Sequence, residues 1–147
     1  MKATTAEIPG NERVEVNRFC WLREDEVPRL DALSHELRSL NGESTARIHR
    51  APLLSSLLLS GLALAESKAQ TLDVFTGHGE RFAYQVTQED VDHVKRLRRS
   101  LWSKAKGRPS LEDLHAALMR LALHAAETDE SFARNLATRA LRASESA

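Results

Sequence analysis

The feature that most constrains this chain is an internal repeat, in which one pattern recurs about 64 residues further along. Each copy has strand-like residues, acidic residues, an apolar series at helical spacing, a glycine break and a second apolar helix. The two apolar series are Val27, Leu30, Leu33, Leu37 and Val91, Val94, Leu97, Leu101. A lone strand–helix–helix unit would leave a strand edge unpaired and a helix face uncovered, so we expect two units to complete each other.

The repeat predicts a polar N-terminal arm, two units joined by a linker, and a C-terminal segment that is either a helix or a tail. In that order these cover residues 1–12, 13–68, 69–80, 81–127 and 128–147. We expect strands at 13–22 and 81–86, and helices at 23–40, 88–104 and 110–127. The remaining helix ends near residue 68 and begins either near Thr45 or at Pro52, because proline suits a first helical turn.

Composition places the chain among globular proteins. Its 147 residues suffice for one domain with a core, and its formal net charge is zero. A single cysteine, Cys20, fits a reducing compartment, and we expect a cytoplasmic protein. The first residues lack the apolar core of a signal peptide. The apolar run at 53–65 is shorter than the ~20 residues that span a bilayer, so we expect no membrane partner.

No catalytic or metal-binding pattern is present in the sequence. The six histidines show neither HxH nor HExxH spacing, and no phosphate-binding loop occurs. Acidic pairs such as Glu89 and Asp90 stand at predicted helix starts, where they serve as capping residues. We therefore expect a binding protein that is not an enzyme and has no cofactor.

Strand, helix, glycine turn and Ser-capped helix is a layout that resembles the ribbon-helix-helix DNA-binding proteins. In that family two copies pair their strands into an antiparallel ribbon. This chain resembles a fused version, similar to the virulence-C type accessory proteins of T-DNA and conjugative plasmid transfer. The resemblance implies a mainly α fold with a two-stranded antiparallel ribbon, made from two ribbon-helix-helix units in one pseudo-dimeric monomer. Further self-association is left open.

A ribbon of this kind reads bases with the side chains that point away from the helices. In the second strand these are Arg81, Ala83 and Gln85. In the first strand two registers are open. One points Asn17, Phe19 and Trp21 outward, although two aromatics are unusual on a base-reading face; a one-residue slip exposes Arg18 and Cys20 instead. Asn17 and Arg18 are therefore alternative base-reading candidates.

Phosphate contacts are expected at the start of the second helix in each unit, where free N–H groups and the helix dipole favour anions. The candidates are Ser44, Thr45 and Arg47 in the first unit, and Lys106, Arg108 and Ser110 in the second. Residues 95–108 carry seven Lys or Arg and no acid, which would extend a positive surface. Both serines are also explained as helix caps.

Two functions follow from these patterns. The favoured one is sequence-specific binding of double-stranded DNA, as a plasmid-type transcriptional regulator or a DNA-transfer accessory factor with transfer-machinery or regulatory proteins as partners. The alternative is a non-catalytic helical adaptor between proteins in a secretion or transfer system. Zero net charge and the unusual first strand favour the adaptor; the duplication and the clustered basic residues favour DNA.

Overall fold

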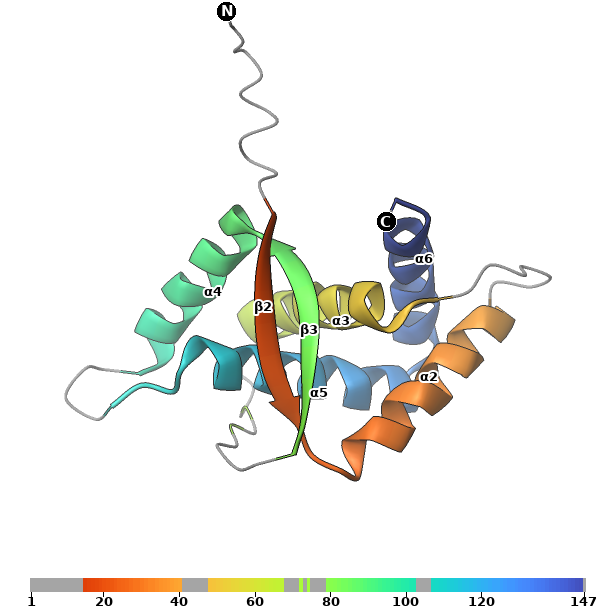
Figure 1. The fold of residues 1–147 in the computed structure, drawn as a ribbon, viewed down its shortest axis with the longest axis horizontal. Coiled ribbons are helices and arrows are strands. Elements are labelled where there is room, and N and C mark those ends of the chain that lie inside the picture. Colours follow the sequence, from red (N-terminus) through yellow and green to blue (C-terminus); the bar gives the residue numbers. More distant parts are fainter. Residues whose placement is uncertain are drawn as a thin grey trace, which may run out of the picture.

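The computed structural model describes residues 15–40, 48–67, 72, 74, 79–102 and 107–146. This part of the chain is mainly helical with a two-stranded antiparallel sheet, as expected (Figure 1). Its elements are β2 (Glu15–Leu22), α2 (Glu26–Leu40), α3 (Arg50–Ser67), β3 (Glu80–Thr87), α4 (Gln88–Leu101), α5 (Leu111–Thr128) and α6 (Glu130–Ser146). The expected N-terminal arm, residues 1–12, and most of the linker, 69–80, lie outside the described residues.

Several element boundaries differ from the expected ones. Helix α3 begins at Arg50, between the two predicted starts, which places Pro52 in its first turn. Helix α4 ends three residues early, because Trp102 is extended with φ −130° and ψ 131°. The last segment forms the helix α6 and not a tail.

The two strands pair antiparallel about one central position. Phe19 lies opposite Ala83, and these two residues are also 64 positions apart, which is the spacing of the repeat. On either side, Asn17 lies opposite Gln85 and Trp21 opposite Arg81. The ribbon therefore joins equivalent segments of the two strand–helix–helix units about its centre.

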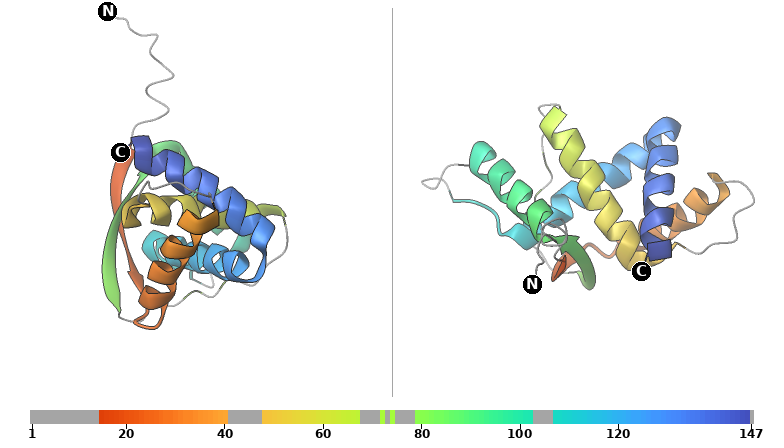
Figure 2. Two further views of the ribbon diagram at one scale, coloured as in Figure 1. Left: turned by 90° about the vertical axis from the view of Figure 1, so that its right-hand side faces the viewer. Right: turned by 90° about the horizontal axis from the view of Figure 1, so that it is seen from above.

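Only one face of this ribbon is covered. Side chains alternate between faces, and the buried ones pack on α3 and α5. They are Cys20, Leu22, Phe82, Tyr84 and Val86. Figure 2 shows every helix of the described residues on one side of the ribbon and none of them on the other. The opposite face of the ribbon is therefore exposed.

Helices α3 and α5 cross beneath the ribbon (Figure 2), and each is 18 residues long. Gly61 permits their close approach, because a Cβ there would lie 1.9 Å from the backbone oxygen of Leu118. Helix α6 packs on α2, α3 and α5, burying Ala133, Leu136 and Ala140. The apolar series are buried as expected except at their ends: Val27 is half-buried, and Leu101 is 48% exposed.

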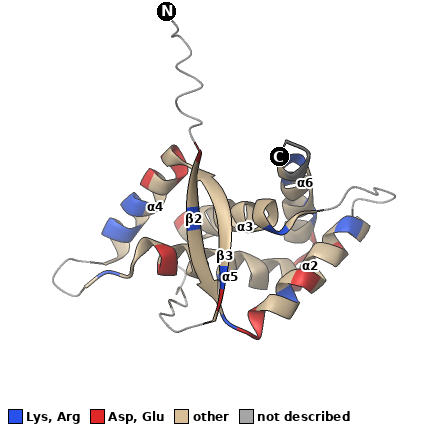
Figure 3. Ribbon diagram, viewed as in Figure 1, with Lys and Arg blue, Asp and Glu red and all other residues tan. Residues whose placement is uncertain are grey.

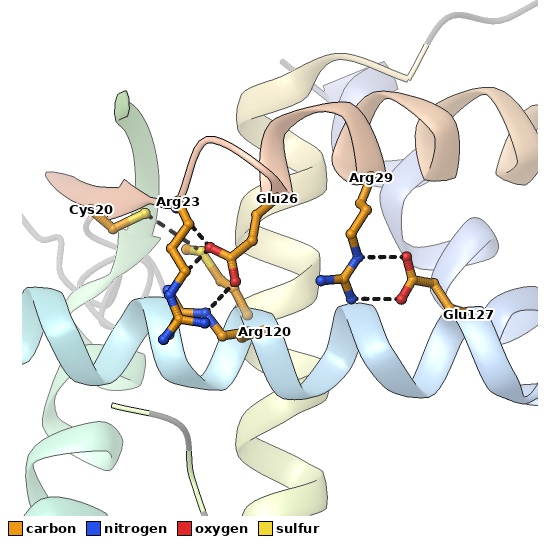
Figure 4. Close-up of polar contacts among 7 residues, drawn as sticks. Cys20, Arg23, Glu26, Arg29, Arg120 and Glu127 are labelled. Atoms are coloured by element: carbon orange, nitrogen blue, oxygen red, sulfur yellow. Dashed lines mark hydrogen bonds and ion pairs between the residues drawn. The ribbon is translucent and has the colours of Figure 1, made fainter. Parts of the chain in front are cut away.

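Two ion pairs join α2, the first helix of the first unit, to α5, the second helix of the second unit. Buried Glu26 of α2 pairs with buried Arg120 of α5, and also accepts a 2.8 Å hydrogen bond from the Arg23 amide (Figure 4). Further along α2, Arg29 donates to both carboxylate oxygens of Glu127 through two of its guanidinium nitrogens, at 2.6 and 2.9 Å. Removing one member of a buried pair would leave an uncompensated charge in the core.

We predict that Gly61→Ala destabilises the fold by about 1–3 kcal/mol, because the added methyl group would overlap the α5 backbone. On an open helix surface the same change would stabilise by about 1 kcal/mol. Equilibrium urea unfolding measures the difference, and an equal or higher stability of the variant would contradict the close crossing.

We predict that Arg120→Met lowers the free energy of unfolding by about 3–5 kcal/mol, because Glu26 would remain charged and buried. The double variant Glu26→Leu/Arg120→Met should recover much of this loss. Arg29→Met is the matched control, since it breaks a partly exposed pair worth about 1 kcal/mol or less. Urea unfolding of wild type and the three variants measures these losses, and equal losses in Arg120→Met and Arg29→Met would refute the role of the buried pair.

Candidate nucleic-acid interface

The exposed face of the ribbon gathers polar and aromatic side chains from both units. Asn17 of β2 and Arg81, Ala83 and Gln85 of β3 are exposed on it. The structure thus brings together four of the five candidate base-reading residues, and it selects the register in which Asn17 points outward. Cys20, which the alternative register would expose, is fully buried.

Contacts within this face hold its polar side chains in place. The Gln85 amide nitrogen donates to the Asn17 side-chain oxygen at 3.1 Å across the ribbon. The Arg81 guanidinium carbon lies 3.8 Å from the centre of the Phe19 ring, which is a stacked cation–π contact. Ser55 of α3 donates to the Gln85 backbone oxygen at 2.5 Å, anchoring β3 from behind. Asn17, Arg81 and Gln85 are therefore oriented before any ligand arrives.

Arg18, the alternative candidate, lies on the helix-facing side of β2. Its side chain is 26% exposed and pairs with Glu112 at the start of α5 at 3.5 Å. Because strand side chains alternate, an outward Asn17 requires an inward Arg18. Arg18 is thus directed away from the exposed face.

The two aromatics of β2 remain on the exposed face. Phe19 is 40% exposed and Trp21 is 41% exposed. Phe19 occupies the centre of the ribbon opposite Ala83, and Trp21 lies opposite Arg81. One end of the face is therefore amide-rich, and the other combines aromatic rings with a guanidinium group.

A buried polar contact supports the ribbon from below. The Tyr84 hydroxyl and His115 Nδ1 of α5 are 2.6 Å apart. Burial, together with the nearby positive charge of Arg18, lowers the pKa of His115 to about 3. Burial likewise raises the pKa of Tyr84. Since His115 Nε2 is buried with no hydrogen-bond partner among the described residues, a protonated ring would carry an unsatisfied N–H.

Burial also raises the pKa of the Cys20 thiol, to about 12. The thiol contacts the Met119 sulfur at 3.7 Å (Figure 4). Cys20 therefore acts as a small core residue, in keeping with the absence of a thiolate at neutral pH.

The start of α5 is built around Ser110. Its side chain accepts from the Asp113 amide at 3.1 Å, so Ser110 is the N-cap of the helix. Arg108 donates to the Trp102 backbone oxygen at 2.9 Å, and Arg98 to the Pro109 oxygen at 3.2 Å. These two hydrogen bonds connect the residues just before α5 to the end of α4, and they place positive charge beside the start of α5.

The start of α3 differs from its expected form. Helix α3 begins at Arg50, so Ser44 cannot cap it as Ser110 caps α5. Arg50 pairs with Asp31 of α2 at 2.8 Å and its guanidinium lies 5.0 Å from the centre of the Phe82 ring. Four candidate phosphate contacts lie outside the described residues: Ser44, Thr45, Arg47 and Lys106.

Positive charge is concentrated on α4. Its first half carries Glu89, Asp90 and Asp92, and its second half carries Lys95, Arg96, Arg98 and Arg99. Figure 3 shows this division, with red near the ribbon end of the helix and blue along the remainder. The basic run expected from the sequence thus lies mostly on one helix.

Sequence reasoning missed Ser55 and His115 as supports of the ribbon. Each lies in the second helix of its unit, where the sequence pattern indicates an apolar helix. Their partners are 30 or more residues away in the sequence. A polar residue within an apolar helix was the available signal, but it does not identify the partner.

Within the described ranges, no cluster of three or more His, Cys, Asp or Glu residues is placed to hold a metal ion. Among the same residues, no helix has the length and apolarity needed to cross a membrane. Comparison of the chain with models of protein families, with characterised proteins and with solved structures gives no match. The functional argument therefore rests on the residues of the ribbon and their surroundings.

We predict that acid destabilises this fold partly through His115. Its pKa is about 3 when folded and about 6.5 when unfolded, so only the unfolded chain takes up this proton between those values. The stability that the fold owes to an uncharged His115 is therefore fully present above pH 6.5 and is lost progressively as the pH falls toward 3. From pH 7 to 5 the loss is about 2 kcal/mol, at about 1.4 kcal/mol per pH unit.

Urea unfolding at both pH values, for wild type and Tyr84→Phe/His115→Leu, measures this loss. The double variant removes both polar partners and should lose correspondingly less stability on acidification. His35→Gln, which removes an exposed histidine, is the control and should keep the wild-type pH dependence. An unchanged pH dependence in the double variant would exclude His115 as the cause.

Proposed function

We propose that this chain is a fused ribbon-helix-helix protein that binds double-stranded DNA sequence-specifically, with the exposed ribbon face in the major groove. The observation that carries the proposal is the convergence of Asn17, Arg81 and Gln85 on that face. The pairing of the two strands about Phe19 and Ala83 supports the pseudo-dimeric arrangement, since it joins positions that are equivalent in the repeat.

The dimensions of the ribbon suit the groove. The major groove of B-DNA is about 12 Å wide and admits a two-stranded ribbon. With all helices on the opposite side, β2 and β3 can enter without a clash from the rest of the described fold (Figure 2). The N-cap region of α5, with Ser110 and Arg108, then offers positive potential to a flanking phosphate.

The side chains of the ribbon match particular base edges. Arg81, stacked on Phe19, can direct its nitrogens to the guanine O6 and N7 acceptors. With Gln85 donating to Asn17, the Asn17 amide nitrogen remains as a donor and the Gln85 side-chain oxygen as an acceptor for adenine. Ala83 allows close approach to a thymine methyl group.

The two units present different residues at equivalent outward positions. Asn17 corresponds to Arg81, Phe19 to Ala83 and Trp21 to Gln85. A homodimer reads two identical half-sites, whereas this face would prefer a site that is not a perfect palindrome. Such a site suits either a plasmid-type transcriptional regulator or an accessory factor at a transfer origin or T-DNA border.

The exposed aromatics favour a second candidate, a non-catalytic adaptor that binds another protein. Phe19 and Trp21 are each about 40% exposed, and aromatic side chains are enriched at the energetic centres of protein interfaces. On this view the ribbon holds the two units together and its open face contacts a partner protein.

Fluorescence anisotropy with a random-sequence duplex, at about 50 and 200 mM salt, separates the two candidates. DNA binding predicts an affinity that falls with salt, and randomised-site selection should then yield a non-palindromic site. Absence of binding at the lower salt concentration would favour the adaptor. A symmetric repeat as the best site would contradict unequal reading by the two units.

We predict that Arg81→Ala weakens binding to the selected site by about 1–3 kcal/mol and relaxes preference at one base pair. Binding to random duplex should change much less. Arg134→Ala is the matched control, because Arg134 is an exposed arginine on α6, paired with Glu130, and α6 lies on the helical side of the ribbon. If Arg81→Ala leaves the ratio of specific to non-specific affinity unchanged, this arginine does not read a base.

A further inference from the structure

The two halves of the fold differ on the surface turned away from the ribbon. Leu37 of α2 and Leu101 of α4 occupy equivalent positions in the repeat, yet their exposed fractions are 0% and 48%. Leu101 is one of three large hydrophobic side chains exposed in the described chain, and the other two lie on the ribbon. The difference follows from what covers each helix.

Helix α6 covers the α2 half. It packs on α2, α3 and α5 through a stripe of mostly small residues. The buried members of this stripe are Ala133, Leu136, Ala137 and Ala140. Arg139 also donates to the Ser60 hydroxyl of α3 at 3.2 Å. In Figure 2, seen from above, α6 lies between α3 and α2, whereas the described elements place no comparable helix beside α4.

A groove is present at the corresponding place on the α4 half. It lies between α4 and the end of α3, has a volume of about 320 Å³, and is lined by Ala65, Leu97 and Leu101. Glu66 of α3 pairs with His93 of α4 at its edge. In the other half Arg29, which is 64 positions before His93, pairs with Glu127 of α5, and Glu127 lies three residues before α6 begins. The groove thus corresponds to a surface that α6 approaches in the other half.

The charge around the groove restricts what can fill it. Arg96 of α4 lines it, and the one carboxylate of its lining, Glu66, already pairs with His93. Two copies facing each other through this surface would bring their Arg96 side chains together, which disfavours self-association by this surface. An occupant with acidic residues beside its apolar face would complement it.

We propose that this groove docks an amphipathic helix of a partner protein, with small aliphatic residues on its inner face and acidic residues along its flanks. Leu101 and Leu97 supply the apolar contact, and Arg96 pairs with an acidic flank. The C-terminal ends of α3 and α4, whose residues line the groove, lie away from the ribbon (Figure 2), so the partner helix and a ribbon ligand bind without competing.

The probe is a fluorescent peptide with the α6 sequence, residues 130–146, carrying Arg134→Glu, Arg139→Glu and Arg142→Glu. It keeps an apolar stripe that already fits an equivalent surface and gives it acidic flanks. Anisotropy titration of the full chain should give saturable binding with a Kd on the order of 100 µM or tighter. Leu101→Lys, which keeps the positive charge of the surface, should weaken this binding at least tenfold.

Two controls complete the test. Phe19→Lys changes an exposed apolar residue on the ribbon and should leave peptide affinity unchanged. The peptide with the unaltered α6 sequence should bind at least fivefold more weakly, because its arginines would face Arg96. The proposal is overturned if the acidic peptide shows no saturable binding up to about 1 mM, if Leu101→Lys does not weaken it, or if the unaltered peptide binds equally well.

Discussion

The antiparallel pairing of β2 with β3 is the constraint from which the remaining geometry follows. An isolated two-stranded ribbon is marginally stable in water, so its covered face must pack on helices. Because Phe19 and Ala83 meet at its centre, the two strands point the same alternate positions outward, and α3 and α5 meet beneath them. Gly61 then becomes necessary, since the two helices cover a ribbon only two strands wide and cross in close contact.

The helices that follow the strands begin in related but unequal ways. In the first unit, the Glu26 carboxylate accepts from the Arg23 amide. In the second, the Thr87 hydroxyl accepts from the Asp90 amide at 3.1 Å. These are the two reciprocal hydrogen bonds of a capping box, one in each unit. The longer Glu26 side chain also reaches Arg120, which gives the first unit a buried ion pair across the fold.

The sequence predicted the second strand better than the first. Arg81, Ala83 and Gln85 alternate with Phe82, Tyr84 and Val86, so period-two patterning placed all six side chains on the correct faces. Strand β2 has the opposite pattern, with its aromatic rings on the outward face and Arg18 on the inward face. The inward Arg18 pairs with Glu112, which is 94 positions along the chain and becomes its partner only after folding. Leu101 was missed for the same reason, because coverage by α6 is a tertiary property that equivalent apolar positions do not share.

Carrying both units in one chain allows their surfaces to diverge. In a symmetric dimer, every outward residue appears twice, so a change at one ribbon position alters both half-sites. Here Phe19 lies opposite Ala83, and the small side chain of Ala83 leaves room for the Arg81 guanidinium to stack on the Phe19 ring. A second phenylalanine at position 83 would compete for the same space. The same freedom lets α6 cover the α2 half, while the groove beside α4, lined by Arg96 and Leu101, stays open. Because the two units differ, one small fold carries two separate surfaces, the exposed ribbon face and the groove beside α4. In a symmetric dimer the residues of each surface would occur twice.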